Sequence, residues 1–163
     1  MASIAQYQFF KELYAEENTR YNELTKKAEV YFSIVSLFLS AVLFKFNDVS
    51  SSIGKLHNVC LIIGLSISLI AVGIALLLLI YSLKIRKYEG TIDMEEYIGK
   101  NKTYYQEDGE FYEDRIADFI VAIDRNTETN NKRADLLTIS TYFIVAGLLF
   151  LIAFFIYFFT LNK

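Results

Sequence analysis

The sequence predicts an all-α integral membrane protein with three transmembrane helices, of which the first and third extend into the cytosol as a parallel helical stalk. Three apolar runs, 30–46, 59–83 and 136–161, contain no Asp, Glu, Arg or His, and Lys45 at the edge of the first run is their only formal charge. The runs hold 17, 25 and 26 residues, and at a rise of about 1.5 Å per residue about 17–25 apolar residues suffice for a helix to cross a hydrocarbon layer of about 30 Å. The chain contains no proline, so a helix that enters the membrane is expected to continue beyond its surface.

The first element is an N-terminal helix that leads into the first apolar run. Its apolar and aromatic residues recur at alternating spacings of three and four, which is typical of one face of a helix. The members of this stripe are Tyr7, Phe10, Tyr14, Glu17, Tyr21, Leu24, Ala28 and Tyr31. Because Glu17 is the only charged member, the pattern predicts a coiled-coil-like contact along residues 1–29.

The later elements are the second apolar run and a long helix that leads into the third. Gly90, Gly99 and Gly109 mark turns in the stretch between them. A second stripe then recurs through Tyr112, Ile116, Phe119, Ile123, Asn126, Asn130 and Leu137. Since this helix and the N-terminal helix both run toward the membrane, we expect them to lie parallel.

The positions of Lys and Arg predict the orientation of the spans. Four of these residues fall in 1–29 and nine in 84–135, which is thirteen of the sixteen in the chain. The N-terminus and the long loop are therefore expected in the cytosol and the C-terminus outside. The predicted organisation is a single membrane domain, 1–163, made of a cytosolic amphipathic helix (1–29), a span (30–46), a short outer loop (47–58), a span (59–83), a cytosolic cap and helix (84–135) and a span (136–161).

Polar residues interrupt both stripes at similar heights above the predicted membrane. At 1.5 Å per residue, those of the first helix lie level with those of the second. The predicted polar layer of the stalk consists of Glu17, Arg20, Asn22, Arg125, Asn126 and Asn130. Such a layer fixes helix register in many coiled coils; the alternative is a switch point through which the stalk acts on the spans.

The turn-rich part of the long loop combines lysines with tyrosines. Lys100, Lys102, Tyr104 and Tyr105 could together stack a base and neutralise a phosphate. They form a candidate ligand cap, but no glycine-rich phosphate loop accompanies them. A solvated connector or a contact with a neighbouring subunit is the alternative interpretation.

Small and hydroxyl residues recur along the first two spans. They are Ser33, Ser36 and Ser40 in the first, and Gly64 and Ser68 in the second. Small residues at such spacings let helix backbones approach closely, and hydroxyls can form hydrogen bonds across the contact. The same face could instead border water in an oligomeric pore.

The residue inventory argues against several classes of function. His57 is the only histidine and Cys60 the only cysteine, so the sequence predicts no metal site, no catalytic residues and no enzyme. We also expect no cofactor. A net charge of −3 without a concentrated basic face argues against a nucleic-acid partner.

Two segments carry a resemblance to a known group of proteins. They are RYNELTKKAEVYFSIVSLFLSAVL, which leads into the first span, and IADFIVAIDRNTETNNKRADLLTISTYFIVAGLLF, which leads into the last. Their layout resembles that of the transmembrane effectors of bacterial anti-phage signalling, the SLATT and Pycsar-effector transmembrane families. The juxtamembrane residues that match the pattern are Asn22, Lys26, Lys27, Ala28, Asn130, Lys132, Arg133 and Ala134.

The resemblance implies an oligomeric protein of the bacterial inner membrane that disrupts the membrane or its potential during infection. The trigger would be a nucleotide second messenger or a cytosolic signalling protein, although this sequence has no separate cyclic-nucleotide-binding domain. The partners expected are the lipid bilayer and further copies of the chain. The alternatives are a membrane anchor or sensor subunit whose stalk recruits a protein partner, and a helix-packing membrane protein of unrelated role.

Overall fold

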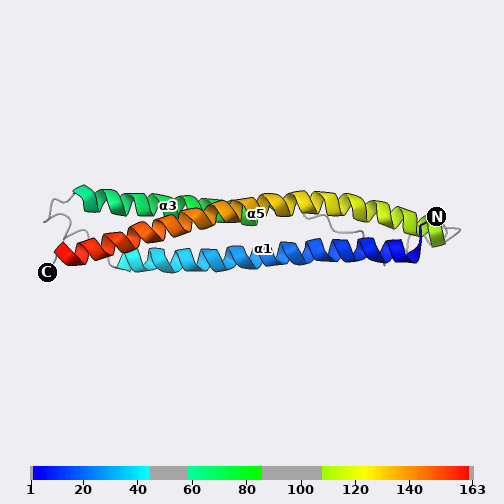
Figure 1. The fold of residues 1–163 in the computed structure, drawn as a ribbon, viewed down its shortest axis with the longest axis horizontal. Coiled ribbons are helices and arrows are strands. Elements are labelled where there is room, and N and C mark those ends of the chain that lie inside the picture. The colour runs from blue at the N-terminus through cyan, green and yellow to red at the C-terminus, as the bar shows by residue number, and fades with distance from the viewer. Residues whose placement is uncertain (1, 45–58, 86–107, 162–163) are drawn as a thin grey trace. The chain divides into compact units, whose positions relative to one another are not determined.

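The computed structural model describes residues 2–44, 59–85 and 108–161, and these are almost entirely helical. Three helices follow one another along the chain: α1 (Ile4–Phe44), α3 (Val59–Lys84) and α5 (Asp108–Leu161) (Figure 1). All three are long and apolar enough to cross a membrane. The predicted all-α class and the three candidate membrane-spanning helices are therefore confirmed.

α1 begins at a capping box formed by Ser3 and Gln6. The backbone N–H of Gln6 donates to Ser3 Oγ at 3.3 Å, and the backbone N–H of Ser3 donates to Gln6 Oε1 at 2.9 Å. This reciprocal pair satisfies N–H groups that have no partner within the helix. No glycine or proline interrupts the 41 residues that follow, so the backbone ladder has no sequence reason to end before Phe44.

The α1 stripe predicted from the sequence is the less exposed face of the helix. Its eight members are half-buried or buried, and the same spacing continues through Val35 and Val42, which are buried. α1 thus keeps a seven-residue period from Tyr7 to Val42, the period of a left-handed coiled-coil seam.

The stripe on α5 is likewise the less exposed face, but other residues share it. Phe119, Asn126, Asn130 and Leu137 are buried, and Tyr112, Ile116 and Ile123 are half-buried. Arg115, Ala122 and Arg133 are buried beside the expected members. The buried positions then repeat every eleven residues, from Arg115 to Asn126 and Leu137, a period of about 3.7 residues per turn.

The chain divides into two compact units. Unit 1 comprises Met1–Leu24 and Ile85–Arg133, and unit 2 comprises Thr25–Lys84 and Ala134–Lys163. In unit 1, aromatic rings of α1 and α5 pack together: the ring centroids of Tyr7 and Tyr112 are 5.4 Å apart, and Phe119 lies 5.8 Å from Tyr7 and 5.7 Å from Tyr14. Such tilted contacts stabilise beyond the area that they bury.

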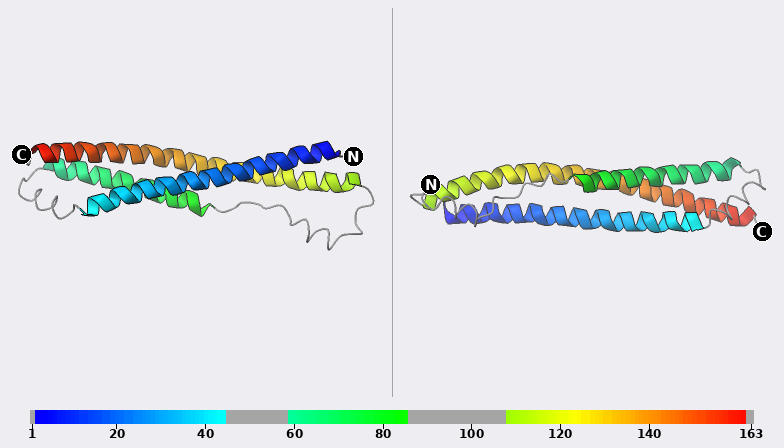
Figure 2. Two further views of the ribbon diagram at one scale, coloured as in Figure 1. Left: turned by 90° about the horizontal axis from the view of Figure 1, so that it is seen from below. Right: turned by 180° about the vertical axis from the view of Figure 1, so that it is seen from behind.

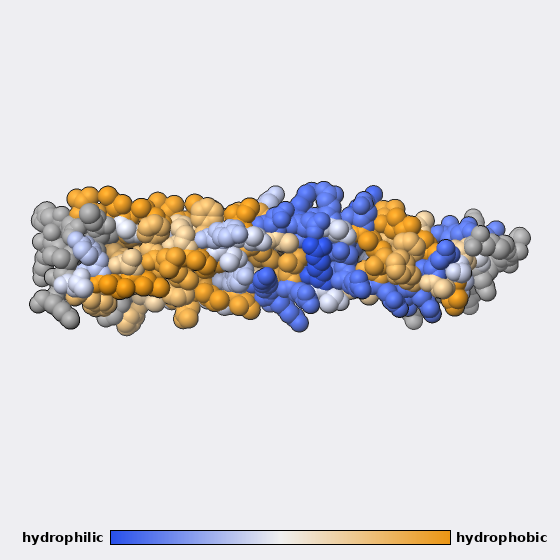
Figure 3. Space-filling model, in the orientation of Figure 1, coloured by the Kyte–Doolittle hydropathy of each residue, from blue (hydrophilic) through white to orange (hydrophobic). Residues whose placement is uncertain are grey.

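Unit 2 contains α3 and the C-terminal parts of α1 and α5, with α3 beside the C-terminal part of α5 (Figures 1 and 2). Its buried side chains include Val35, Leu79, Leu151 and Phe154. Large apolar side chains also cover its outside, among them Leu37, Phe44 and Leu77, and the surface in Figure 3 is correspondingly orange over this unit. An apolar exterior of this kind suits contact with hydrocarbon rather than with water.

Candidate functional site

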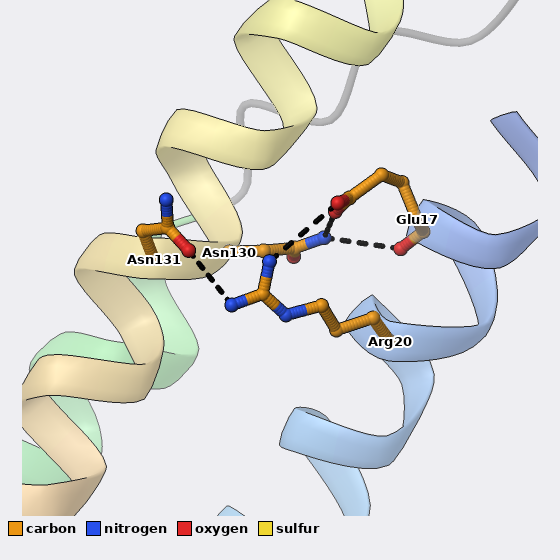
Figure 4. A network of polar contacts seen from close by, with 4 residues as sticks. All are labelled: Glu17, Arg20, Asn130 and Asn131. Atoms are coloured by element: carbon orange, nitrogen blue, oxygen red, sulfur yellow. Dashed lines mark hydrogen bonds and ion pairs between the residues drawn. The ribbon is translucent and has the colours of Figure 1, made fainter. Parts of the chain in front are cut away.

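A cluster of four polar side chains joins α1 to α5 in unit 1 (Figure 4). This polar cluster consists of Glu17 and Arg20 from α1 and of Asn130 and Asn131 from α5. The Asn130 side-chain amide donates to the Glu17 backbone carbonyl at 3.0 Å and to Glu17 Oε2 at 2.6 Å. Arg20 donates to Asn131 Oδ1 at 2.7 Å and lies 3.5 Å from Glu17 Oε1. One carboxylate therefore meets an amide from α5 and a guanidinium from its own helix.

Burial increases the contribution of these hydrogen bonds to the stability of the α1–α5 contact. Asn130 and Asn126 are fully buried, and only 16% of the Glu17 side chain is exposed. A hydrogen bond to a charged group contributes about 1.5–3 kcal/mol, more than one between neutral groups. Within the described residues, the buried Asn130 Oδ1 accepts no hydrogen bond. The cluster is therefore strongly bonded on its donor side and unsatisfied at one acceptor.

Arg133 and Tyr21 form a second cross-helix contact, one turn further along both helices. The guanidinium carbon lies 4.2 Å from the centroid of the Tyr21 ring, and Nη1 donates to the Tyr21 backbone carbonyl at 3.3 Å. Burial lowers the pKa of Arg133, and the tyrosine opposes this effect. Stacking on an aromatic face lets a guanidinium stay buried with part of its hydration replaced.

The structure brings together three of the six residues predicted for the polar layer. Glu17, Arg20 and Asn130 lie in the polar cluster, and Asn126 is buried one turn before Asn130. Asn22 and Arg125 are exposed. The prediction placed them by height alone, and the rotation of each helix puts both side chains on its exposed face.

Sequence reasoning missed Asn131 and Arg133 as members of the α1–α5 contact. Arg133 lies three residues after Asn130 and seven after Asn126, so the spacing of the stripe itself could have indicated it. Asn131 is exposed and adjoins the stripe, and no pattern in the sequence indicates that Arg20 reaches it.

On the exposed face of α5, Lys132 donates a hydrogen bond to Glu128 and lowers the pKa of that carboxyl.

The predicted serine face of the first span lies on the outside of unit 2. Ser33 and Ser40 are exposed and Ser36 is half-buried. The Ser33 hydroxyl donates to the Glu29 carbonyl at 2.9 Å, and that of Ser40 donates to the Ser36 carbonyl at 2.8 Å. Because each donor is satisfied within its own helix, these serines can face hydrocarbon at low cost.

The second span contributes a direct contact between helices. Ser68 is buried, and its hydroxyl donates to the backbone carbonyl of Gly147 on α5 at 2.7 Å. A Cβ at Gly147 would lie 2.7 Å from Val72 Cγ2 and 3.4 Å from the Ser68 carbonyl oxygen. The absence of a side chain at Gly147 is thus what allows α3 and α5 to approach so closely.

Two other predicted features have different outcomes. A Cβ at Gly64 would meet no atom within 4 Å, so this glycine does not mediate a close contact between the described helices. The candidate ligand cap, Lys100, Lys102, Tyr104 and Tyr105, lies outside the described residues, as does His57. Within the part of the chain that the structure describes, no group of three or more His, Cys, Asp or Glu is placed to hold a metal ion.

Comparison of the chain with protein-family models, with curated proteins and with solved structures finds no match.

Proposed function

We propose that this protein is an oligomeric effector of the bacterial inner membrane that disrupts membrane integrity or potential when its cytosolic part receives a signal. The observation that carries the proposal is the continuity of α1 and α5. Each is a single helix that includes both a charged, tyrosine-bearing stretch and an apolar stretch long enough to span a membrane. In this proposal, a change at the charged stretch is transmitted along the same helix to the apolar stretch.

In this proposal, unit 1 is a parallel helical stalk in the cytosol and the polar cluster is its switch point. The partners of successive α1 residues support the parallel direction, because Tyr7, Tyr14, Glu17 and Tyr21 meet progressively later residues of α5. The unsatisfied Asn130 Oδ1 supports the switch, since a second arrangement that satisfies this acceptor would compete with the first.

Assembly with further copies is supported by the sparse burial within one chain. In the apolar 18-residue stretch of α1 that could span a membrane, only 17% is buried within the chain. The corresponding stretches of α3 and α5 are each 28% buried. The remaining faces are open to lipid or to other copies. Small and hydroxyl residues such as Ser33 and Ser40 on the outer face of α1 suit close helix packing.

The test is the membrane potential of bacteria that express the chain, followed with a voltage-sensitive dye. We expect depolarisation upon phage challenge or upon addition of a cyclic nucleotide from a panel, and an unchanged potential without a trigger. The double variant Asn126→Leu and Asn130→Leu should insert normally and shift the response. Asn22→Leu, at an exposed position, is the control. A potential that stays constant under every trigger, with the protein verified in the membrane, would refute the effector function.

A membrane anchor that recruits a cytosolic protein is the second candidate function. It is favoured by large apolar side chains that remain exposed in unit 1, namely Ile4, Phe9, Ile120 and Val121. Purification in mild detergent separates the two functions, because a single homo-oligomer supports the effector and a monomer that retains a defined protein supports the anchor.

A further inference from the structure

The polar cluster of unit 1 leaves one buried acceptor without a hydrogen bond. Asn130 is fully buried, and its Oδ1 accepts no hydrogen bond from the described residues. Asn130 and Arg20 both meet the carboxylate of Glu17, Asn130 at Oε2 and Arg20 at Oε1 (Figure 4). One carboxylate therefore holds a guanidinium and an unsatisfied acceptor in the same cluster, with no hydrogen bond between the two.

Arg20 has more donors than it uses well. A guanidinium carries five N–H groups. Nη2 donates to Asn131 Oδ1 at 2.7 Å, whereas Nη1 lies 3.5 Å from Glu17 Oε1, beyond the usual range of an N–H···O hydrogen bond. The donor that the buried acceptor lacks is thus present on the same guanidinium.

The two asparagines differ in what they lose without Arg20. Asn131 is exposed, so water replaces the arginine at its Oδ1. Water does not replace it at Asn130, and a buried acceptor without a hydrogen bond is costly. Transfer of Arg20 from Asn131 to Asn130 therefore exchanges a replaceable bond for one that satisfies a buried group, at the cost of the present packing. Two arrangements of similar free energy result.

The order of the two asparagines in the chain determines the motion that the transfer requires. Asn130 and Asn131 are neighbours in α5, so their side chains leave the helix about 100° apart. A turn of α5 about its axis that carries Asn130 toward Arg20 carries Asn131 away from it. Glu17 and Arg20 lie three residues apart on α1, so α1 keeps the same face toward α5 in both arrangements.

We propose that Arg20 exchanges between Asn131 Oδ1 and Asn130 Oδ1, and that this exchange turns α5 about its axis relative to α1 within unit 1. In the first arrangement, the one described above, Arg20 donates to Asn131. In the second, it donates to Asn130, and Asn131 is hydrated. The inference rests on the proposed function in taking the polar cluster as the switch point, and it names the two states of that switch.

The test measures distances between spin labels on the two helices of unit 1. Labels at Glu12→Cys on α1 and Asp124→Cys on α5, both exposed positions, are attached to the full chain in a Cys60→Ala background. The labelled protein is diluted with unlabelled chain before reconstitution into nanodiscs, so that only distances within one chain contribute. Double electron–electron resonance should resolve two distances, one for each arrangement.

Two substitutions at the exposed Asn131 provide a matched pair that leaves the buried amide unchanged. Asn131→Ala removes the acceptor of the first arrangement, so the ratio of the second population to the first should rise by roughly threefold. Asn131→Asp adds an ion pair with Arg20 in the first arrangement, so the same ratio should fall by roughly two- to fivefold. Added salt should weaken the effect of Asp and leave that of Ala.

Arg20→Met separates the exchange from a general effect of residue 131. Without the guanidinium, the Ala and Asp variants should give the same distance distribution. Asn22→Ala, at an exposed position of α1, should give that of wild type, and circular dichroism verifies that all variants stay helical. One distance that no variant shifts, or shifts in the same direction for Ala and Asp, would overturn the proposal. Because the distances are measured without a trigger, failure of the exchange is distinguishable from failure of the effector function.

Discussion

At the scale of single residues, Asn130 determines whether a carboxylate can remain at the α1–α5 contact. Its amide donates twice to Glu17, once to the backbone and once to the side chain. Its own Oδ1 is buried without a hydrogen bond from the described residues. A substitution at this position therefore removes two favourable interactions and one unfavourable one, and the balance depends on what replaces the amide.

Asn130→Leu and Asn130→Asp should differ in a defined order. Leu leaves Glu17 without its amide donor, at an expected cost of roughly 1–3 kcal/mol in the free energy of unfolding, partly offset by removal of the unsatisfied acceptor. Asp places a second carboxylate against the first and should cost more at neutral pH. Denaturant titration of the detergent-solubilised protein, followed by circular dichroism, measures both.

Acid provides the internal check on this order. Protonation of one carboxylate of the Asp variant lets it donate to the other, so its stability relative to wild type should recover as the pH falls. The Leu variant should show no comparable recovery. Asn22→Leu, at an exposed position, should stay within about 0.5 kcal/mol of wild type. An Asp variant as stable as the Leu variant at neutral pH would contradict the described geometry.

At the scale of helices, a close approach of α3 and α5 in unit 2 depends on Gly147. The Ser68 hydroxyl reaches the Gly147 carbonyl at 2.7 Å, and the Cβ of any larger residue would meet Val72 Cγ2 at 2.7 Å. Two other glycines, Gly64 and Gly73, lie on α3, and a Cβ at either would meet no atom within 4 Å. The three glycines thus have different surroundings despite equal chemistry.

Gly→Ala substitutions at these three positions should separate packing from helix propensity. Gly147→Ala should destabilise, because Val72 or the whole of α3 must shift. Gly64→Ala and Gly73→Ala should be neutral or stabilising by up to about 1 kcal/mol, since alanine is the better helix former. Ser68→Ala should cost about 0.6 kcal/mol, the usual value of a hydrogen bond between membrane helices.

Thermal unfolding in one detergent compares the four variants directly. Gly64→Ala and Gly73→Ala serve as controls, since each adds the same methyl group at a position where it would meet no atom within 4 Å. If Gly147→Ala were as stable as these two, the close contact between α3 and α5 would be wrong.

The helices differ in how far their buried faces could be predicted. α1 has aromatic and aliphatic residues at almost every buried position, so periodicity alone found its stripe. α5 buries Arg115 and Arg133, which apolar periodicity does not indicate. Both side chains are buried, and each guanidinium lies against a partner, Asp118 at 2.8 Å for Arg115 and the Tyr21 ring for Arg133. From the sequence, Gly64 was predicted to lie in a close helix contact and Gly147 was not. Only the packing of the helices shows that the close contact is at Gly147.

At the scale of the whole molecule, the all-α fold class and the candidate membrane spans follow from composition. Which residues of two helices contact each other does not. Long runs without charge suffice to predict three helices that can cross a membrane. Which polar residues meet depends on the rotation of each helix about its axis, as the exposed Asn22 and the bonded Asn131 illustrate. The predicted orientation is also an inference from composition, since it rests on the distribution of Lys and Arg between loops rather than on packing, and it stays a prediction.

That orientation can be measured with single cysteines in a Cys60→Ala background. Glu16→Cys on α1 and Glu128→Cys on α5 lie at exposed positions of unit 1, while Lys55→Cys lies in the predicted outer loop. A membrane-impermeant maleimide should label Lys55→Cys in intact bacterial spheroplasts, and Glu16→Cys and Glu128→Cys only after the membrane is opened. Labelling of all three in opened spheroplasts confirms their reactivity. The opposite pattern would place unit 1 outside the cell, where no cytosolic signal could reach the polar cluster, and the proposed function would be refuted.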